Sequence, residues 1–386
     1  MHAIYLDHNA TTPLRPEVWD AMRPLMTEAF GNPSSPHTFG RKARQRLEDA
    51  REQLALMLGA YPDELTFTSG ATEANNLAVF GLLGGGRSRD EEPLSGGRGS
   101  CAASLLEHPC VVEPLRHLAA RGVAVEWLPV SSRGVVAGPA PRAGTGLVCV
   151  MLANHETGAV QPVPEIAASL PEGTKLHCDA VQAVGKLNVD FRALGATTLT
   201  ASAHKFGGPK GVGVLLTRRG TDLKPLTFGG HQQGGRRPGT EPVALAVGMA
   251  VALELATRNR AANLARLGAH RARLWNALQR DCAPVVLNGP EIGAADALPT
   301  TLNVSFLGCR ADVLLMALDL ARVACSTGSA CSSGSLLPSP VLRAMGAPDE
   351  VLRSALRFSF APTQTGDEID EAAARIARSV RAVRAG

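Results

Sequence analysis

A lysine that directly follows a serine, an alanine and a histidine is the residue most suggestive of chemistry in this chain. Lys205 lies in the segment Ser-Ala-His-Lys-Phe-Gly-Gly-Pro-Lys-Gly (202–211), at the end of the apolar run 199–203. A strand that ends in an amine beside phosphate-binding groups suits a lysine that forms a Schiff base with an aldehyde cofactor. A surface lysine in a glycine-rich turn would give the same local pattern, so the rest of the chain must decide.

A second segment is typical of a phosphate site. The stretch Phe-Thr-Ser-Gly-Ala-Thr-Glu (67–73) follows a predicted strand and opens a predicted helix. Gly70 and Ala71 allow close approach to the backbone, Thr72 offers a hydroxyl, and the start of a helix presents unpaired N–H groups to an anion. The same residues would also make an ordinary helix N-cap.

An acidic residue lies at the end of a third apolar run. Asp179 follows 175–178, and Gln182 comes three residues later. In open α/β sheets, ligands bind at the carboxyl ends of the strands. A carboxylate there can pair with the protonated pyridine nitrogen of pyridoxal phosphate (PLP) and keep the ring an electron sink, although a helix-capping aspartate is the common alternative.

Two more strand ends carry polar side chains. His108 follows another apolar run, where an imidazole could stack on a ring and move protons. Asn154 and His155 follow the run 147–152. Because the ends of four predicted strands deliver polar groups, we expect these residues to share one site. We expect no metal, because the eight cysteines are scattered without a C-x-x-C pair.

The elements that must position these residues alternate along the chain. Strand-like apolar runs between helical patterns indicate an α/β fold with a mostly parallel sheet. Two strands and a long amphipathic helix at 257–280 predict a second, smaller lobe, and segments 84–100 and 131–146 are expected to be loops. The predicted strands are 64–68, 123–129, 147–152, 175–178, 199–203, 213–217, 301–306 and 355–360, and the other predicted helices are 16–29, 41–58, 71–83 and 164–170.

Composition narrows the class of protein. The 386 residues include 45% hydrophobic and 19% charged residues, with a net charge of +4, as expected for a soluble globular protein. Direct nucleic-acid binding is not expected, because no basic run is interleaved with aromatic residues. No apolar run reaches the length of a membrane span, and the first residues lack a signal-like pattern, so we expect a cytoplasmic location away from membranes.

With these residues in place, the chain resembles the NifS/IscS-type cysteine desulfurases, PLP enzymes of the class V aminotransferase family. The resemblance covers nearly the whole chain, and its motifs appear in the same order. The matching segments are 5–13, 31–35, 68–73, 107–108, 179–182, 202–205, 237–240, 328–331 and 356–359.

The resemblance implies the PLP-dependent transferase fold type I. A large PLP-binding domain is expected at 13–256. A smaller C-terminal α/β domain is expected to comprise 1–12 and 257–386, with a catalytic cysteine loop at about 325–340.

The resemblance also assigns roles around the cofactor. Lys205 would bind PLP covalently, Asp179 would pair with the ring nitrogen, and His108 would stack on the ring. Gln182 would contact the ring hydroxyl, and His155 occupies the position of an asparagine that contacts the cofactor or substrate in the family. The phosphate would be held by Ala71, Thr72, Ser202 and His204, and by Thr240 from a neighbouring subunit.

The remaining implied roles concern the substrate, L-cysteine. Arg357 would bind its carboxylate, together with Asn32. Cys331 would be the nucleophile that keeps the sulfur as a persulfide, and L-alanine would be released. Cys325, six residues earlier, is the competing thiol, but residues 323–325 are predicted to form a strand.

The resemblance further implies a homodimer and a sulfur-acceptor protein in iron–sulfur cluster or other thio-cofactor biosynthesis. Two alternatives stay open. One is a selenocysteine lyase or another class V PLP enzyme, and the other is a scaffold without activity that kept the fold.

Overall fold

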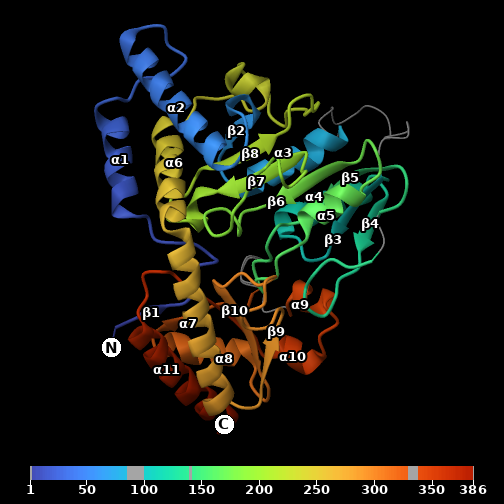
Figure 1. Ribbon diagram of the computed structural model, residues 1–386, viewed down its shortest axis with the longest axis vertical. Coiled ribbons are helices and arrows are strands. Elements are labelled where there is room, and N and C mark those ends of the chain that lie inside the picture. The colour runs from blue at the N-terminus through green and yellow to red at the C-terminus, as the bar shows by residue number, and fades with distance from the viewer. Residues whose placement is uncertain (1, 85–99, 139–140, 329–337, 386) are drawn as a thin grey trace.

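The computed structural model describes residues 2–84, 100–138, 141–328 and 338–385. Cys331 and the middle of the predicted cysteine loop therefore lie outside the described residues, as does most of the predicted loop 84–100. Figure 1 shows two layered bodies, one built on a large sheet and one on a smaller sheet.

A seven-stranded sheet forms the centre of the larger body. All its strands run parallel except β8, which is antiparallel to both of its neighbours. The inner strands are buried on both faces, which explains their unbroken apolar runs. The strand order is β2 (Leu65–Thr68), β8 (Gly213–Thr217), β7 (Thr198–Ser202), β6 (Lys175–Asp179), β5 (Thr145–Cys149), β3 (Ser100–Ser104) and β4 (Val125–Leu128).

Helices cover both faces of this sheet (Figure 1). On one face, α3 (Ala71–Leu83) and α4 (Pro109–Ala119) contribute to one hydrophobic core. The opposite core contains residues of α1 (Pro16–Thr27), α2 (Thr38–Met57), α5 (Val163–Ser169) and α6 (Val243–Arg258). Short 3₁₀ turns lie at Pro62–Glu64, Ala203–Lys205 and Gln232–Gly235.

A second sheet lies below the first in Figure 1. It is antiparallel, in the order β12 (Ala355–Ser359), β10 (Thr301–Phe306) and β9 (Val285–Asn288), and the N-terminal strand β1 (Ile4–Tyr5) pairs nearby with β11 (Val323–Ala324). A separate core joins this sheet to α7 (Arg260–Asp281), α8 (Ala311–Leu320) and α11 (Gly366–Ala385). The short helices α9 (Pro340–Ala344) and α10 (Asp349–Arg353) join a small cluster that also includes Leu106 and Met151.

The α/β class and the mostly parallel sheet confirm the sequence prediction. Strands 213–217 and 301–306 and helix 71–83 have the predicted bounds, and the other predicted elements differ at their ends by one to three residues. The predicted loop 131–146 ends early, because β5 begins at Thr145. Helices α4, α8, α9 and α10 and strands β1, β3 and β9 had no predicted counterpart.

The division into two domains at 12/13 and 256/257 stays a prediction. Two observations lie close to these boundaries: β1 pairs in the small body, and Asn259 separates α6 from α7. Within the described residues, every helix is too short or too polar to cross a bilayer.

Candidate active site

A cavity of about 550 Å³ lies at the carboxyl edge of the large sheet. Asp179 ends β6 and Ser202 ends β7, so both lie at this edge. The loops after β2, β3 and β5 add further side chains, because parallel strands direct their carboxyl ends to one side. Ten predicted site residues line the cavity, namely Ala71, Thr72, His108, His155, Asp179, Gln182, Ser202, His204, Lys205 and Arg357.

One end of the cavity is built to hold an anion. Helix α3 begins here with Gly70 at its N-cap, and a Cβ added to Gly70 would meet nothing within 4 Å. The helix start therefore offers N–H groups and a positive dipole end to a ligand. Thr72 and Ser202 add hydroxyl groups, and burial together with nearby lysines lowers the pKa of His204 to about 4, so its ring is a neutral partner.

A chain of hydrogen bonds fixes the carboxylate of Asp179. Asn75 Nδ2 donates to Asp179 Oδ2 at 2.7 Å, and the backbone N–H of Val181 donates to Oδ1 at 3.0 Å. Because the Asn75 amide donates in this direction, its Oδ1 accepts from His177 Nε2 at 3.0 Å. His177 Nδ1 lies 2.9 Å from the hydroxyl of Thr198. The network holds Asp179 in position as a hydrogen-bond acceptor.

Lys205 follows β7 in the short 3₁₀ turn Ala203–Lys205. Its Nζ donates to the carbonyl groups of Asn9 at 2.7 Å and Ala10 at 2.9 Å. Gln182 lies beside it and donates to the same Asn9 carbonyl at 3.1 Å. The N-terminal segment thus closes one side of the cavity and holds the amine at its wall.

Two histidines that line the cavity lie next to each other. The ring centroids of His108 and His155 are 5.4 Å apart at an angle of 65°. Burial lowers the pKa of both imidazoles. The backbone N–H of Cys110 donates to His108 Nδ1 at 3.2 Å, so in its neutral form this ring carries its proton on Nε2.

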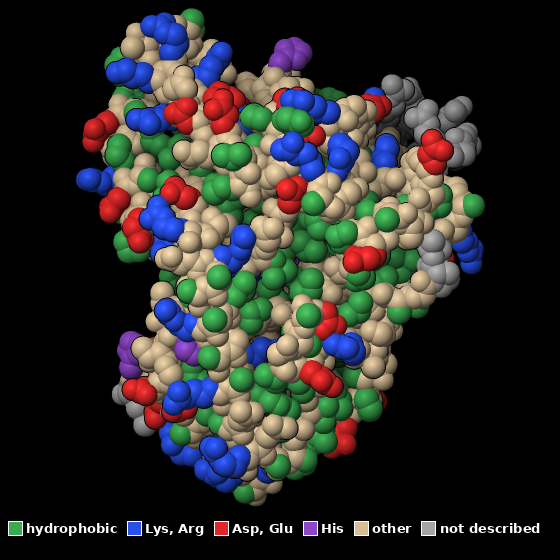
Figure 2. All heavy atoms as spheres, in the orientation of Figure 1, with side chains coloured by type: hydrophobic (Ala, Val, Ile, Leu, Met, Phe, Trp, Pro, Cys, Tyr) green, Lys and Arg blue, Asp and Glu red, His purple; other side chains and the backbone are tan. Residues whose placement is uncertain are grey.

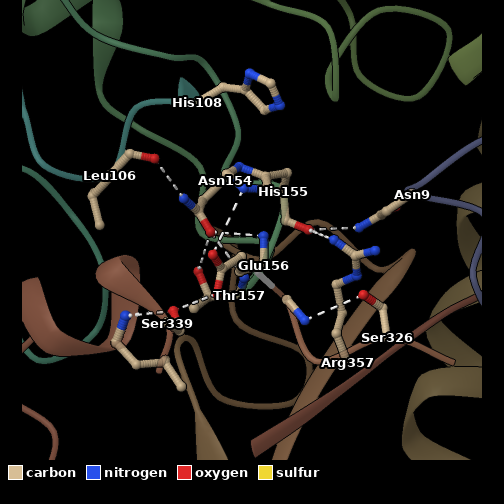
Figure 3. A network of polar contacts seen from close by, with 12 residues as sticks. Asn9, Leu106, His108, Asn154, His155, Glu156, Thr157, Ser326, Ser339 and Arg357 are labelled. Carbon is tan, nitrogen blue, oxygen red and sulfur yellow. Dashed lines mark hydrogen bonds and ion pairs between the residues drawn. The ribbon is translucent and has the colours of Figure 1, made fainter. Parts of the chain in front are cut away.

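Arg357 brings a buried guanidinium to the cavity from β12. The residue is 1% exposed, and its Nη2 pairs with Asp7 Oδ1 at 2.7 Å. Its Nη1 donates to the backbone carbonyl of His155 at 3.0 Å (Figure 3). Arg357 Nε and His155 Nδ1 are buried without a hydrogen-bond partner among the described residues.

Glu156 links the residues on either side of the undescribed segment 329–337 (Figure 3). Ser339 donates to Glu156 Oε2 at 2.5 Å and caps α9 by accepting from the Leu342 N–H. A Cβ on Gly328 would lie 2.6 Å from the same carboxyl oxygen. Burial raises the pKa of Glu156 to about 7.

Two predicted residues that the structure describes, Thr240 and Asn32, do not line the cavity of this chain. Thr240 is exposed in a neighbouring hollow, and Glu73, which lines both hollows, pairs with Arg237 at 2.9 Å. Asn32 is exposed and accepts from the backbone of Ser34 at 2.9 Å. Cys331 lies outside the described residues, so its role stays a prediction.

Several residues around the cavity had no role in the sequence analysis. Asn75 lies one helical turn after Ala71, but its partner Asp179 is more than a hundred positions away in the sequence. Asn9, Glu73, Glu107 and Lys186 were missed for the same reason. Burial of a polar residue would have marked these positions as functional, but burial cannot be read from the sequence.

The donor set fits PLP. The start of α3 can bind an anion, Asp179 supplies a carboxylate and Lys205 supplies an amine. Buried polar atoms of Asn9, His155 and Arg357 have no partner among the described residues. These are the groups that would hold a phosphate, a pyridinium nitrogen, an aldehyde and a substrate carboxylate. The fold and cavity are those of a fold type I PLP-dependent transferase.

Comparison with known proteins identifies the family. The Aminotransferase class-V model matches residues 4–372. The chain is 41% identical over 372 residues to "Cysteine desulfurase IscS" of Dictyoglomus turgidum, covering 95% of this chain and 92% of that protein. It is 42% identical over 376 residues to "IscS-like cysteine desulfurase" of Mycobacterium tuberculosis, covering 95% and 94%.

A solved structure of a "NifS-like protein" superposes with a TM-score of 0.87 at 32% identity, covering 98% of this chain and 99% of the other. The chain belongs to the class V aminotransferase family, whose members use PLP. Its relatives named above are cysteine desulfurases.

Proposed function

We propose that this protein is a PLP-dependent cysteine desulfurase that converts L-cysteine to L-alanine and keeps the sulfur as a persulfide on Cys331. One observation carries the proposal: a single cavity gathers Lys205, Asp179, His108 and Arg357 beside the anion-binding start of α3. The identity to named cysteine desulfurases along almost the whole chain supports the same activity.

The cofactor would be held by residues already described. Lys205 would bind its aldehyde, Asp179 its ring nitrogen and Gln182 its ring hydroxyl, while His108 would stack on the ring. Its phosphate would lie at Ala71, Thr72, Ser202 and His204. When bound, PLP supplies an electron sink for bonds at the substrate's α-carbon.

The protein's own residues orient the substrate and move protons. Arg357, assisted by Asn32, would bind the carboxylate of L-cysteine, because a guanidinium can bond both oxygens. His155 would add a contact to the cofactor or substrate. Lys205 would take the proton from the α-carbon, and His108 would assist proton movement.

In the sulfur-transfer step, the thiolate of Cys331 would attack the substrate sulfur. A sulfur–sulfur bond forms, the carbon–sulfur bond breaks, and the carbon that loses sulfur gains a proton, which yields L-alanine. Cys325 is a poor alternative nucleophile, because it packs against the small-body core and burial strongly raises its thiol pKa.

The oligomeric state of the protein and the destination of the sulfur are also part of the proposal. A homodimer would let Thr240 reach the phosphate of the partner subunit. Within this chain, the pair Glu73–Arg237 joins the Thr240 segment to the start of α3. An acceptor protein would take the persulfide sulfur for iron–sulfur cluster or thio-cofactor assembly in the cytoplasm.

Turnover of the purified, PLP-loaded protein with L-cysteine and a thiol reductant tests the activity. We expect equal amounts of alanine and sulfide. Alanine formed from selenocysteine alone would identify a selenocysteine lyase. A PLP-loaded protein that yields neither product from either substrate would point to another class V enzyme or to an inactive scaffold.

A further inference from the structure

A second cavity of about 550 Å³ lies on the other side of the N-terminal segment. It shares Asn9 and Lys205 with the active-site cavity, but its remaining lining residues are different. The N-terminal residues 8–17, the junction of α6 with α7, and residues 360–363 after β12 form its walls. This cavity therefore lies where the two bodies meet, behind the wall that carries Lys205.

The walls are largely apolar. Leu264 and Leu267 line it from α7, and Phe206, Phe360 and Leu14 add further apolar side chains. Leu264 is half-buried on the amphipathic helix α7. A cavity of this size with apolar walls and a few polar groups has the character of a small-molecule site.

The polar part of the lining is cationic. Four basic side chains line the described cavity, Arg15, Lys186, Lys205 and Arg260, against the carboxylate of Glu17. Glu17 lies 3.7 Å from Arg15, and Lys205 serves the active site, so Lys186 and Arg260 are the cations available to a ligand.

Lys186 and Arg260 both line this cavity and are held by neighbouring parts of the chain. Arg260 donates to the carbonyl of Leu187 at 3.4 Å and to Asn188 Oδ1 at 3.0 Å, directly after Lys186 in the chain. Lys186 Nζ donates to Gln182 Oε1 at 2.8 Å, and burial lowers its pKa to about 7. An anion beside this amine would favour its charged form.

One buried polar atom is consistent with this character. His8 Nδ1 belongs to a lining residue and has no hydrogen-bond partner among the residues that the structure describes. Buried polar groups are usually paired. In the tautomer that carries its proton on Nδ1, His8 would be a donor for a carboxylate head.

We propose that this second cavity binds a small amphipathic monocarboxylate. The carboxylate head would lie at Lys186 and Arg260, and the apolar body would contact Leu264, Leu267 and Phe360. A single negative charge suits the site, because two cations are available and most of the wall is apolar. This inference goes beyond the desulfurase activity and does not depend on it.

Isothermal titration calorimetry of the PLP-loaded protein with octanoate tests the proposal. We expect saturable binding of one octanoate per chain, at least about tenfold tighter than acetate or 1-octanol, which lack the tail or the charge. Leu264→Trp, which fills the cavity, should abolish binding, and Arg260→Met should weaken it about tenfold. The heat of binding is measured without turnover, so it is independent of the proposed activity.

Matched controls lie on α7 and at the end of α6. Ala265→Trp places the same side chain on the exposed side of α7, and Arg258→Met removes an exposed arginine that pairs with Glu254 outside the cavity. Both should bind octanoate like the parent protein. Absence of octanoate binding to the parent would overturn the proposal. Unchanged binding to both Leu264→Trp and Arg260→Met would overturn it equally, as would equal affinity for 1-octanol.

Discussion

Glu107 and Glu156 are carboxyl groups that the fold removes from water. Burial raises the pKa of Glu107 to about 8 and that of Glu156 to about 7. Burial lowers the pKa of His177 to about 3 and that of His204 to about 4. Around neutral pH the neighbourhood of the cavity therefore contains neutral imidazoles and carboxyl groups that retain protons, and this limits the charge buried beside the cofactor.

The raised pKa of Glu107 predicts a pH-dependent stability. The folded protein keeps this proton up to about pH 8, whereas the unfolded chain loses it near pH 4. The stability that protonated Glu107 contributes to the folded protein is therefore complete below pH 4 and is lost as the pH rises through 8. Replacing Glu107 with Gln, which keeps an acceptor for the Met151 N–H and the Ser104 hydroxyl, should remove this dependence.

Urea denaturation of both proteins between pH 5 and 9 measures this effect. The free energy of unfolding of the parent should fall relative to Glu107→Gln by up to about 1.4 kcal/mol per pH unit. Parallel curves for the two proteins would show that Glu107 titrates normally.

Lys205 is the residue on which the cofactor assignment depends. We expect Lys205→Ala to lose the visible absorption of covalently bound PLP and all production of alanine, because the amine that binds the aldehyde is gone. Lys224→Ala, at a lysine paired with Asp222 away from the cavity, should retain both. Normal turnover of Lys205→Ala would refute the assignment.

The two thiols near the end of the chain can be distinguished by substitution. Cys331→Ser should bind PLP and L-cysteine with unchanged absorption but yield no persulfide, because a hydroxyl is a much weaker nucleophile. Cys325→Ser should stay active, since that thiol is buried and its pKa is raised. Persulfide labelling with mass spectrometry reports both results, and the reverse pattern would assign the nucleophile to Cys325.

At the scale of elements, buried side chains connect segments that the sequence separates widely. Glu156 follows β5, yet it bonds Ser339 at the start of α9 and contacts the neighbourhood of Gly328. Asn154 orients this turn by accepting from the N–H groups of Glu156 and Thr157, both at 2.9 Å. One end of the segment that carries Cys331 is therefore bonded to the turn that carries His155, and the other end lies against it.

Substitution of Gly328 tests this connection. Gly328 and Gly346 have similar backbone angles, with φ of +79° and +76°. A Cβ on Gly346 would meet nothing within 4 Å, whereas a Cβ on Gly328 would lie 2.6 Å from Glu156 Oε2. Both alanine variants carry the cost of a left-handed residue, about 1–2 kcal/mol.

Gly328→Ala should lose roughly a further 1–2 kcal/mol, because buried Glu156 must move and loosen its bond to Ser339. Urea denaturation of the two variants at one pH gives the comparison. Equal losses of unfolding free energy would show that Glu156 moves aside at little cost.

At the scale of the whole molecule, exposed aromatic residues lie beside the segment that contains Asn32. Phe30 and Phe39 are 68% and 57% exposed, and their rings stack at 5.9 Å between centroids. Exposed apolar groups that gather together often mark an interface. Figure 2 shows how charged and apolar side chains mix on the viewed face. We expect the Phe30–Phe39 pair to lie in the proposed dimer interface.

A charge at this pair should therefore disrupt the dimer. Phe39→Asp is expected to elute as a monomer and to retain less PLP, because Thr240 would no longer reach the partner's phosphate site. Leu56→Asp, at an exposed position near the other end of α2, is the control and should stay dimeric. Size-exclusion chromatography with light scattering measures the mass, and a dimeric Phe39→Asp protein would place the interface elsewhere.

The sequence by itself determined the fold class and most of the cavity. Apolar runs alternating with helical patterns specify a mostly parallel sheet, and such a sheet brings the carboxyl ends of its strands to one edge. The polar residues placed after those runs, such as His108, Asp179 and Lys205, were therefore predicted together before their distances were known. Helix 71–83 was predictable because its glycine start and apolar body are local signals.

The tertiary structure alone decided which polar residues support one another and which protons they keep. Asn75 holds Asp179, Glu156 joins Ser339, and Asp7 pairs with Arg357, each across a hundred or more positions. Such contacts, and the second cavity between the two bodies, arise where distant segments exclude water together. Burial depends on the packing of the whole chain, so local sequence patterns do not specify it.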